Sequence, residues 1–210
     1  MEFKNYTIDR FLTELKGDLS SPGGGSTAAL VGSLAASLNS MVYSFTIDKK
    51  SFEALSDDNK KKMREFKEKS DSFIEMGLSF MEADRETFME LMDTFKLPKN
   101  TEEEKKYRSK EIRDKTIKAM EVPLQLAKKC LELYDNIDFS IRYGNKNLTS
   151  DGVVAGILLH STIEAAIVNV LVNFNSLIDK SGYEDLKEKC QNIINESLIR
   201  KTSIINFFSI

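Results

Sequence analysis

The chain has 210 residues, with 30 Lys and Arg against 33 Asp and Glu, and its formal net charge is −3. This length suits a single domain over residues 1–210, and the near balance of charge gives no electrostatic reason to expect nucleic acid or an anionic membrane as a partner. The single histidine, His160, argues against a zinc site. We expect the two cysteines, Cys130 and Cys190, to be reduced and buried in a cytoplasmic protein.

Hydrophobic periodicity predicts six helical segments and no strand of useful length. Three prolines and ten glycines leave a composition that favours helix. A capping box at Thr101–Glu104 marks one helix start, Pro123 predicts a kink, and Ser150 is the expected cap of the next helix. The expected helices span residues 7–15, 26–47, 57–95, 101–134, 150 to the break at Gly182, and 183 to near the C-terminus.

Two stretches are nearly free of charge and long enough to cross a bilayer. Residues 19–47 contain no charged side chain, and residues 152–178 contain only Glu164. The first stretch also holds seven serines, four glycines and Asn39, which argues against a membrane span. We expect the two small-residue helices to pack against each other at the centre of a bundle, or to form an oligomer interface.

A glycine motif precedes the first of these helices. Pro22 is followed by Gly23, Gly24 and Gly25, whose backbone N–H groups are bare and free to take positive φ, and then by Ser26. Ser26 or Thr27 is the expected N-cap. The combination suits main-chain binding of an anion or a polar ring edge, although a capped turn explains the same spacing. It matches neither G-x-G-x-x-G nor a P-loop.

Two acids stand in contrasting settings. Asp84 interrupts a helical stripe of Phe and Gly, so it is either an edge carboxylate that reaches water or a partly buried group suited to proton transfer. Asp151 lies in the first turn of a helix, where the dipole favours its charged form, a common structural arrangement. The two carboxylates are therefore expected to take different roles.

Further polar residues lie within apolar helices or at helix ends. Asn169 and Asn173 are four residues apart, and they either satisfy their own chain or line a polar pocket. His160 and Glu164 have the same spacing, which is more typical of a structural pair than of catalysis. Lys96 follows a helix end and suits an anionic tail, although lysines in such places are usually only solvated.

Four sequence blocks, in order, resemble the cyclodeaminase/cyclohydrolase family of folate enzymes, over roughly residues 5–205. The blocks are Pro22–Ser26; Asp84 to Phe88 with Phe95–Lys99 and Glu102–Lys105; Glu121–Leu124; and Gly144–Asn147 with Ser150–Asp151, continuing to Asn169–Asn173.

The resemblance implies an all-α homodimer of long helices with a folate site near the glycine motif. From the contrasting settings of the two acids we expect Asp84 to transfer protons and Asp151 to bind the pterin or stabilise a cation. The expected substrate-binding residues are Gly23, Gly24, Gly25, Ser26, Lys96, Asn145, Asn147, Ser150, Asn169 and Asn173.

The resemblance implies one of two activities. The first is hydrolysis of 5,10-methenyltetrahydrofolate to 10-formyltetrahydrofolate, and the second is formimidoyltetrahydrofolate cyclodeamination with release of ammonia. Both reactions pass through a tetrahedral carbon and need no metal or cofactor beyond the tetrahydrofolate substrate. A third alternative is a non-catalytic helical dimerisation module, in which the motif residues would serve only as caps and core packing.

Overall fold

The protein is all-helical over residues 1–208, the part of the chain that this computed structural model describes. All six expected helices are present. The sequence pattern missed two more, a four-residue helix before α4 and a ten-residue helix after α5. In chain order the elements are η1 (Phe3–Asn5), α1 (Ile8–Leu15), α2 (Gly24–Ser44), α3 (Lys50–Glu53), α4 (Asp57–Thr94), α5 (Glu102–Glu132), α6 (Tyr134–Tyr143), η2 (Lys146–Leu148), α7 (Thr149–Ser176) and α8 (Leu186–Phe207).

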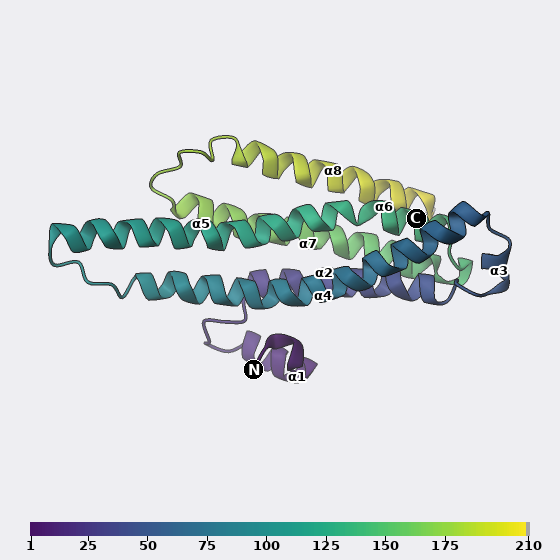
Figure 1. Ribbon diagram of the computed structural model, residues 1–210, viewed down its shortest axis with the longest axis horizontal. Coiled ribbons are helices and arrows are strands. Elements are labelled where there is room, and N and C mark those ends of the chain that lie inside the picture. Colours follow the sequence, from purple (N-terminus) through teal and green to yellow (C-terminus); the bar gives the residue numbers. More distant parts are fainter. Residues whose placement is uncertain (209–210) are drawn as a thin grey trace.

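Four long helices form an elongated bundle (Figure 1). The α4–α5 hairpin lies in front of α2 and α7 in that view, and α8 packs on α7 and α5. Helix α1 lies below the bundle in this view. The short helix η1 contacts α4, and the buried rings of Phe3 and Phe11 pack edge to face. Because α2 begins midway along the bundle, the α4–α5 hairpin extends beyond it at one end.

The two nearly uncharged helices pack against each other as expected. A Cβ at Gly32 of α2 would lie 3.1 Å from Thr162 of α7, so the missing side chain permits close approach of the helices. Among the described residues one helical stretch, Lys146–Ser176, is long and apolar enough to span a membrane by length and composition. In this structure 56% of its apolar window is buried, against α2, α5, α6 and α8.

Of the helix starts predicted from the sequence, the capped start of α5 is confirmed. Thr101 and Glu104 form the predicted capping box of α5. Ser26 does not cap α2, which starts at Gly24 after an extended Gly23, because the Ser26 hydroxyl bonds to α4 instead. Ser150 does not cap α7, since η2 runs into that helix and places Ser150 inside it.

The expected positive φ angles in the glycine motif are also absent. Gly24 and Gly25 are helical, and Gly23 is extended with φ −138°. Among the described residues positive φ occurs at Asp48 and at Gly182, which lies in the loop between α7 and α8. Gly24 and Gly25 therefore matter because they leave room for neighbouring side chains, and not because of their backbone angles.

Candidate functional site

The N-terminus of α2 meets α4 at a half-buried carboxylate, that of Asp84. The Ser26 hydroxyl donates a 2.8 Å hydrogen bond to Asp84 Oδ2, and the backbone of Ser26 bonds to the same side chain. Since Gly23 provides no side-chain cap, Asp84 reaches from α4 to accept from the first turn of α2. The predicted glycine motif and the predicted proton-transfer acid thus form one cluster.

Burial dominates the electrostatics of this cluster. Desolvation raises the pKa of the Asp84 carboxyl above its ordinary value, although the two hydrogen bonds from Ser26 oppose the shift. The absent side chain of Gly25 makes room for this carboxylate, because a Cβ there would overlap Asp84. Gly23 has open space where its Cβ would be, so the three glycines are not equivalent. The arrangement suits a carboxylate that exchanges a proton with a ligand at the end of α2.

Asn169 and Asn173 of α7 lie at the same end of the bundle. A Cβ at Gly24 would lie 3.5 Å from the Asn169 amide, which places Asn169 beside the glycine motif. The Asn169 side chain donates to Ala165 O at 2.8 Å, and Asn173 donates to Ala119 O of α5 at 3.0 Å. Both side-chain amides thus donate to backbone carbonyls. The side-chain carbonyl oxygens of Asn169 and Asn173 remain available to accept hydrogen bonds from a ligand.

A cavity of about 480 Å³ lies one helical turn beyond Asn173. It lies between α5 and the end of α7, and Leu177 and Ile178 supply apolar wall. Two cations from α5, Lys110 and Arg113, line it together with Asp179, whose carboxylate lies 3.4 Å from Arg113 Nε. Sequence analysis missed these cations because the first half of α5 is densely charged, and nothing in the pattern distinguishes them.

Four further predicted residues, Asn145, Asn147, Ser150 and Asp151, lie at the opposite end of the bundle. Asn145 begins η2, where its side chain accepts from the Asn147 backbone N–H at 3.0 Å, and Ser150 and Asp151 follow in the first turn of α7. Asp151 and Asn169 are on the same helix, so 18 residues of rise separate them by about 27 Å. Within one subunit, therefore, Asp151 is not brought to Asp84.

Lys96 and His160 both lie outside the glycine-motif cluster. Lys96 follows α4 at the tip of the hairpin, where it pairs with Asp93 at 2.7 Å on the exposed surface. His160 is buried and bonds through Nδ1 to Ser197 of α8 at 2.8 Å, with Glu164 3.4 Å from Nε2. Burial lowers the pKa of His160, and its contacts join α7 to α8.

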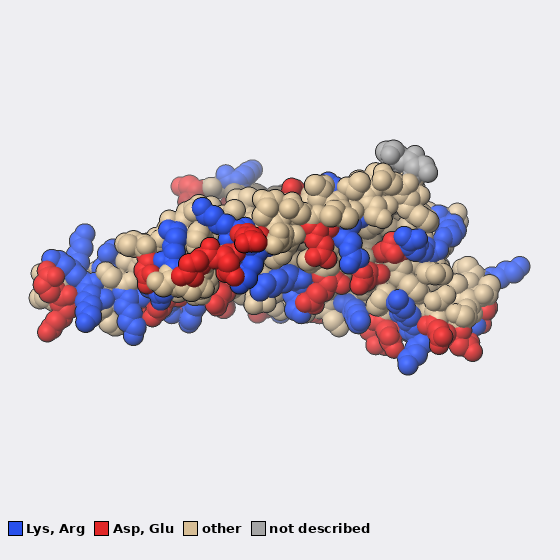
Figure 2. All heavy atoms as spheres, turned by 90° about the horizontal axis from the view of Figure 1, so that it is seen from above, with Lys and Arg blue, Asp and Glu red and all other residues tan. Residues whose placement is uncertain are grey.

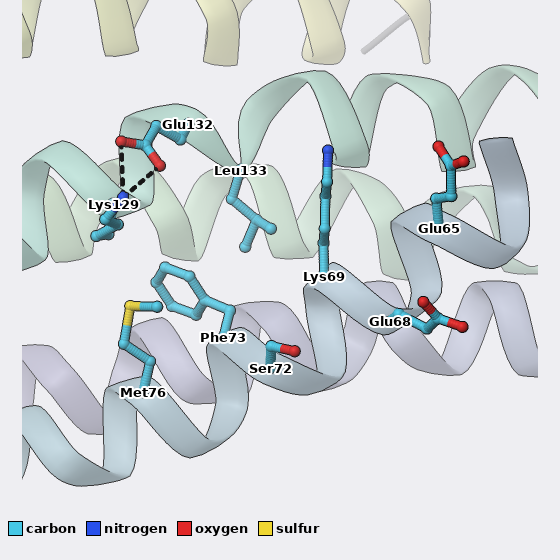
Figure 3. Close-up of a pocket in the computed structure, with 9 residues that line it drawn as sticks. All are labelled: Glu65, Glu68, Lys69, Ser72, Phe73, Met76, Lys129, Glu132 and Leu133. Carbon is cyan, nitrogen blue, oxygen red and sulfur yellow. Dashed lines mark hydrogen bonds and ion pairs between the residues drawn. The ribbon is translucent and has the colours of Figure 1, made fainter.

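A second hollow is an open groove of about 530 Å³ between α4 and the α5–α6 junction. Figure 3 shows Phe73, Met76 and Leu133 on its floor and charged side chains around them, with Lys129 paired to Glu132. It contains no predicted site residue. On the face seen in Figure 2, acidic and basic side chains are interspersed, so this face has no extended basic surface.

Residues 7–192 match the family model described as Formiminotransferase-cyclodeaminase. The chain is 33% identical over 193 residues to a methenyltetrahydrofolate cyclohydrolase of Methylorubrum extorquens, covering 92% of this chain and 91% of the relative. It is 30% identical to formimidoyltransferase-cyclodeaminase of Rattus norvegicus, covering 91% of this chain but 35% of that longer protein.

A solved structure has the same fold. A formiminotetrahydrofolate cyclodeaminase from Thermotoga maritima superimposes with a TM-score of 0.78 at 24% identity. The superposition covers 97% of this chain and 93% of that one. The overall helical fold is therefore also found in a solved protein.

Proposed function

The chain belongs to the formiminotransferase-cyclodeaminase family, and on that premise we propose that it hydrolyses 5,10-methenyltetrahydrofolate to 10-formyltetrahydrofolate. The observation that carries this choice is the identity of 33% over 193 residues to a relative named for the cyclohydrolase reaction. The chain spans 91% of that relative but about a third of the bifunctional relatives, and it is 24% identical to the cyclodeaminase of known structure, of which it covers 93%. The hydrogen-bonded pair of Asp84 and Ser26 supplies a group able to move the protons that the reaction requires.

The proposed reaction begins when water attacks the cationic carbon that bridges N5 and N10 of the folate. The water oxygen forms the new C–O bond while Asp84 accepts a proton from the water. The C–N5 bond then breaks, N5 takes up that proton, and the remaining hydroxyl proton is released as the formyl C=O forms on N10. One proton leaves in total, which balances the lost positive charge of the substrate.

Asp84 suits this sequence for two physical reasons. Its burial raises the pKa of the carboxyl, so it is a stronger base than a solvated aspartate. Its negative charge also stabilises the cationic carbon. The Ser26 hydroxyl fixes the orientation of the carboxylate through the bond to Oδ2.

The cavity beyond Asn173 provides a place for the rest of the ligand. Its apolar wall suits the benzoyl ring of a folate, and Lys110 and Arg113 suit the glutamate carboxylates. The side-chain carbonyls of Asn169 and Asn173 lie between this cavity and Asp84, where they suit the N–H groups of a pterin.

Cyclodeamination is the alternative activity, supported by the family description and by the relative of known structure. The same site would then hold formimidoyltetrahydrofolate, N10 would attack the formimino carbon, and Asp84 would protonate the departing ammonia. A non-catalytic dimerisation module is the third alternative. It predicts no folate binding at all.

The deciding experiment supplies each substrate to purified protein. The decay of methenyltetrahydrofolate absorbance is followed above the uncatalysed rate, with ammonia release from formimidoyltetrahydrofolate measured in parallel. Faster decay of the methenyl compound, with no ammonia release, is the expected result. Ammonia release alone would make the protein a cyclodeaminase, and the absence of folate binding by calorimetry would make it a module.

We also propose that the protein is a homodimer through the outer sides of α2 and α7. Four of the nine exposed residues of α7 are large and apolar, and Leu34 of α2 is 50% exposed. On α7 the apolar members are Val154, Ile157, Val168 and Val172, with Glu164 as the charged one. Light scattering at micromolar concentration tests the proposal, and a monomer would contradict it.

A further inference from the structure

Pro123 lies in the interior of α5 and is buried there. An interior proline is costly to a helix, because it lacks the N–H that would donate to the carbonyl four residues earlier and its ring crowds that carbonyl. In α5 the carbonyl concerned belongs to Ala119, a residue that is 7% exposed. Because a buried carbonyl without a donor destabilises the folded state, Ala119 O needs a donor other than the backbone of residue 123.

Asn173 of α7 provides that donor. Its side-chain Nδ2 donates to Ala119 O at 3.0 Å, and it also donates to Asn169 O, one turn earlier on its own helix, at 3.1 Å. The first bond joins α7 to α5, and the second lies within α7. The proline of one helix is thus matched by a polar side chain of another, at the carbonyl that the proline leaves without its usual partner.

These two bonds fix the orientation of the Asn173 amide. Both acceptors are backbone carbonyls, which cannot donate, so the end of the amide that faces them is its nitrogen. Both hydrogens of Nδ2 are used, and Oδ1 is the atom left for a ligand. Asn173 can therefore accept from a ligand N–H but has no hydrogen to donate to a ligand carbonyl. It is placed one turn before Ser176 and Leu177, which line the cavity between α5 and α7.

We propose that Pro123 is a positioning residue for substrate binding. By withholding an N–H from Ala119 O, it leaves that oxygen to Asn173, whose Oδ1 is then held as a fixed acceptor for an N–H of the ligand. The inference rests on the proposed folate activity, and it adds how the site selects the N–H edge of the pterin. Pro123 acts through Ala119 and Asn173 and not by contact with the ligand.

The test compares Pro123→Ala, Asn173→Ala and the double variant. Alanine is the best helix former, so Pro123→Ala should fold. It gives Ala119 O a backbone donor that competes with Asn173 and frees the amide to turn. Calorimetry with tetrahydrofolate should then show a Kd about 3–10-fold higher. KM for the methenyl compound should rise by the same factor with kcat unchanged, because the interaction is made equally in the ground state and the transition state.

The double variant separates positioning from a general effect on the helix. If Pro123 acts through Asn173, then Pro123→Ala should not raise Kd further once Asn173 is alanine. Stability gives a second readout that needs no ligand. Asn173→Ala leaves Ala119 O without a side-chain donor, and only the Pro123→Ala background supplies a backbone one. Asn173→Ala should therefore lower the folding equilibrium constant about tenfold more beside Pro123 than beside Ala, as measured by urea unfolding.

Pro98→Ala is the matched control, since Pro98 is exposed and lies between α4 and α5, outside any helix. It should bind tetrahydrofolate as the parental protein does. Parental binding by Pro123→Ala, or effects of the two substitutions on Kd that simply multiply, would overturn the positioning role and leave the folate activity standing. A parental protein that binds tetrahydrofolate but does not hydrolyse the methenyl compound would count against the proposed reaction alone, because the Kd values still test Pro123. A parental protein that binds no folate would overturn both.

Discussion

An aspartate lies near a helix N-terminus at each end of the bundle, and the two aspartates differ in their hydrogen-bond partners. At one end Asp84 is half-buried against the first turn of α2, and it accepts from Ser26 across the helix interface. At the other end Asp151 belongs to the helix whose N-terminus it faces, and it is half-buried too. Asp84 therefore differs from Asp151 in its partner, because it accepts from a second helix, and desolvation raises its pKa there. The comparison shows that contact with a second helix, rather than the helix dipole, distinguishes a candidate proton-transfer group from a charge that stabilises its own helix.

Among the variants that test this comparison, Asp84→Asn is expected to have the largest effect on the rate. The variant keeps the shape of the side chain and removes the proton acceptor, so kcat for methenyltetrahydrofolate hydrolysis should fall about 10²–10⁴-fold. KM should change little, because a group that acts in the transition state lowers kcat and kcat/KM together. Initial rates over a range of substrate concentrations measure both constants.

Asp93→Asn is the control for that experiment, since Asp93 is on the same helix but its side chain is 65% exposed. It should retain the parental rate. Asp84 also holds the start of α2, so urea unfolding of Asp84→Asn must show a folded protein before its rate is interpreted. A folded Asp84→Asn protein with the parental rate would reduce Asp84 to a structural cap.

A smaller effect is expected from Gly25→Ala. The new Cβ would overlap the Asp84 carboxylate and displace it, and a displacement of about 1 Å from the reacting geometry costs on the order of 100-fold in rate. Overpacking should also lower the free energy of unfolding by about 1–3 kcal/mol. Gly23→Ala is the matched control, because its Cβ would meet nothing within 4 Å. Equal rates for the two variants would show that the glycine motif is only a connector.

Most of the fold follows from local sequence signals. The capping box at Thr101, the long apolar stripe of α4 and the small residues of α2 and α7 each determine their element without help from distant residues. α6 was missed because it follows α5 directly, with Leu133 ending one helix and preceding the next. A short helix held by tertiary packing gives a weak periodic signal.

The candidate site was harder to predict, because its parts meet only through packing. The apolar stripe on α4 predicted that Asp84 faces inward. It did not indicate that Ser26, instead of capping α2, would donate a hydrogen bond to Asp84. Likewise, order along the chain could not show that Asp151 lies far from Asp84 in one subunit. The buried Asn39–Asn136 hydrogen bond, 2.9 Å long between α2 and α6, had no sequence signal for the same reason.

The smallest predicted effect is the contribution of Asp84 to the pH dependence of stability. Burial raises the pKa of this carboxyl, so the folded protein keeps the proton to a higher pH than the unfolded chain, where the ordinary value is 3.8. The folded state then binds more protons than the unfolded state within that window, and the free energy of unfolding falls as pH rises through it. Asparagine lacks this titration. The stability of the parental protein relative to Asp84→Asn should therefore be greatest below 3.8, decline as pH rises through the folded pKa, and stay constant above it. Urea unfolding of both proteins at a series of pH values measures the difference. An increase of the difference with pH would mean that the hydrogen bonds from Ser26 outweigh burial, and Asp84 would then resemble a stabilised surface acid more than a proton-transfer group.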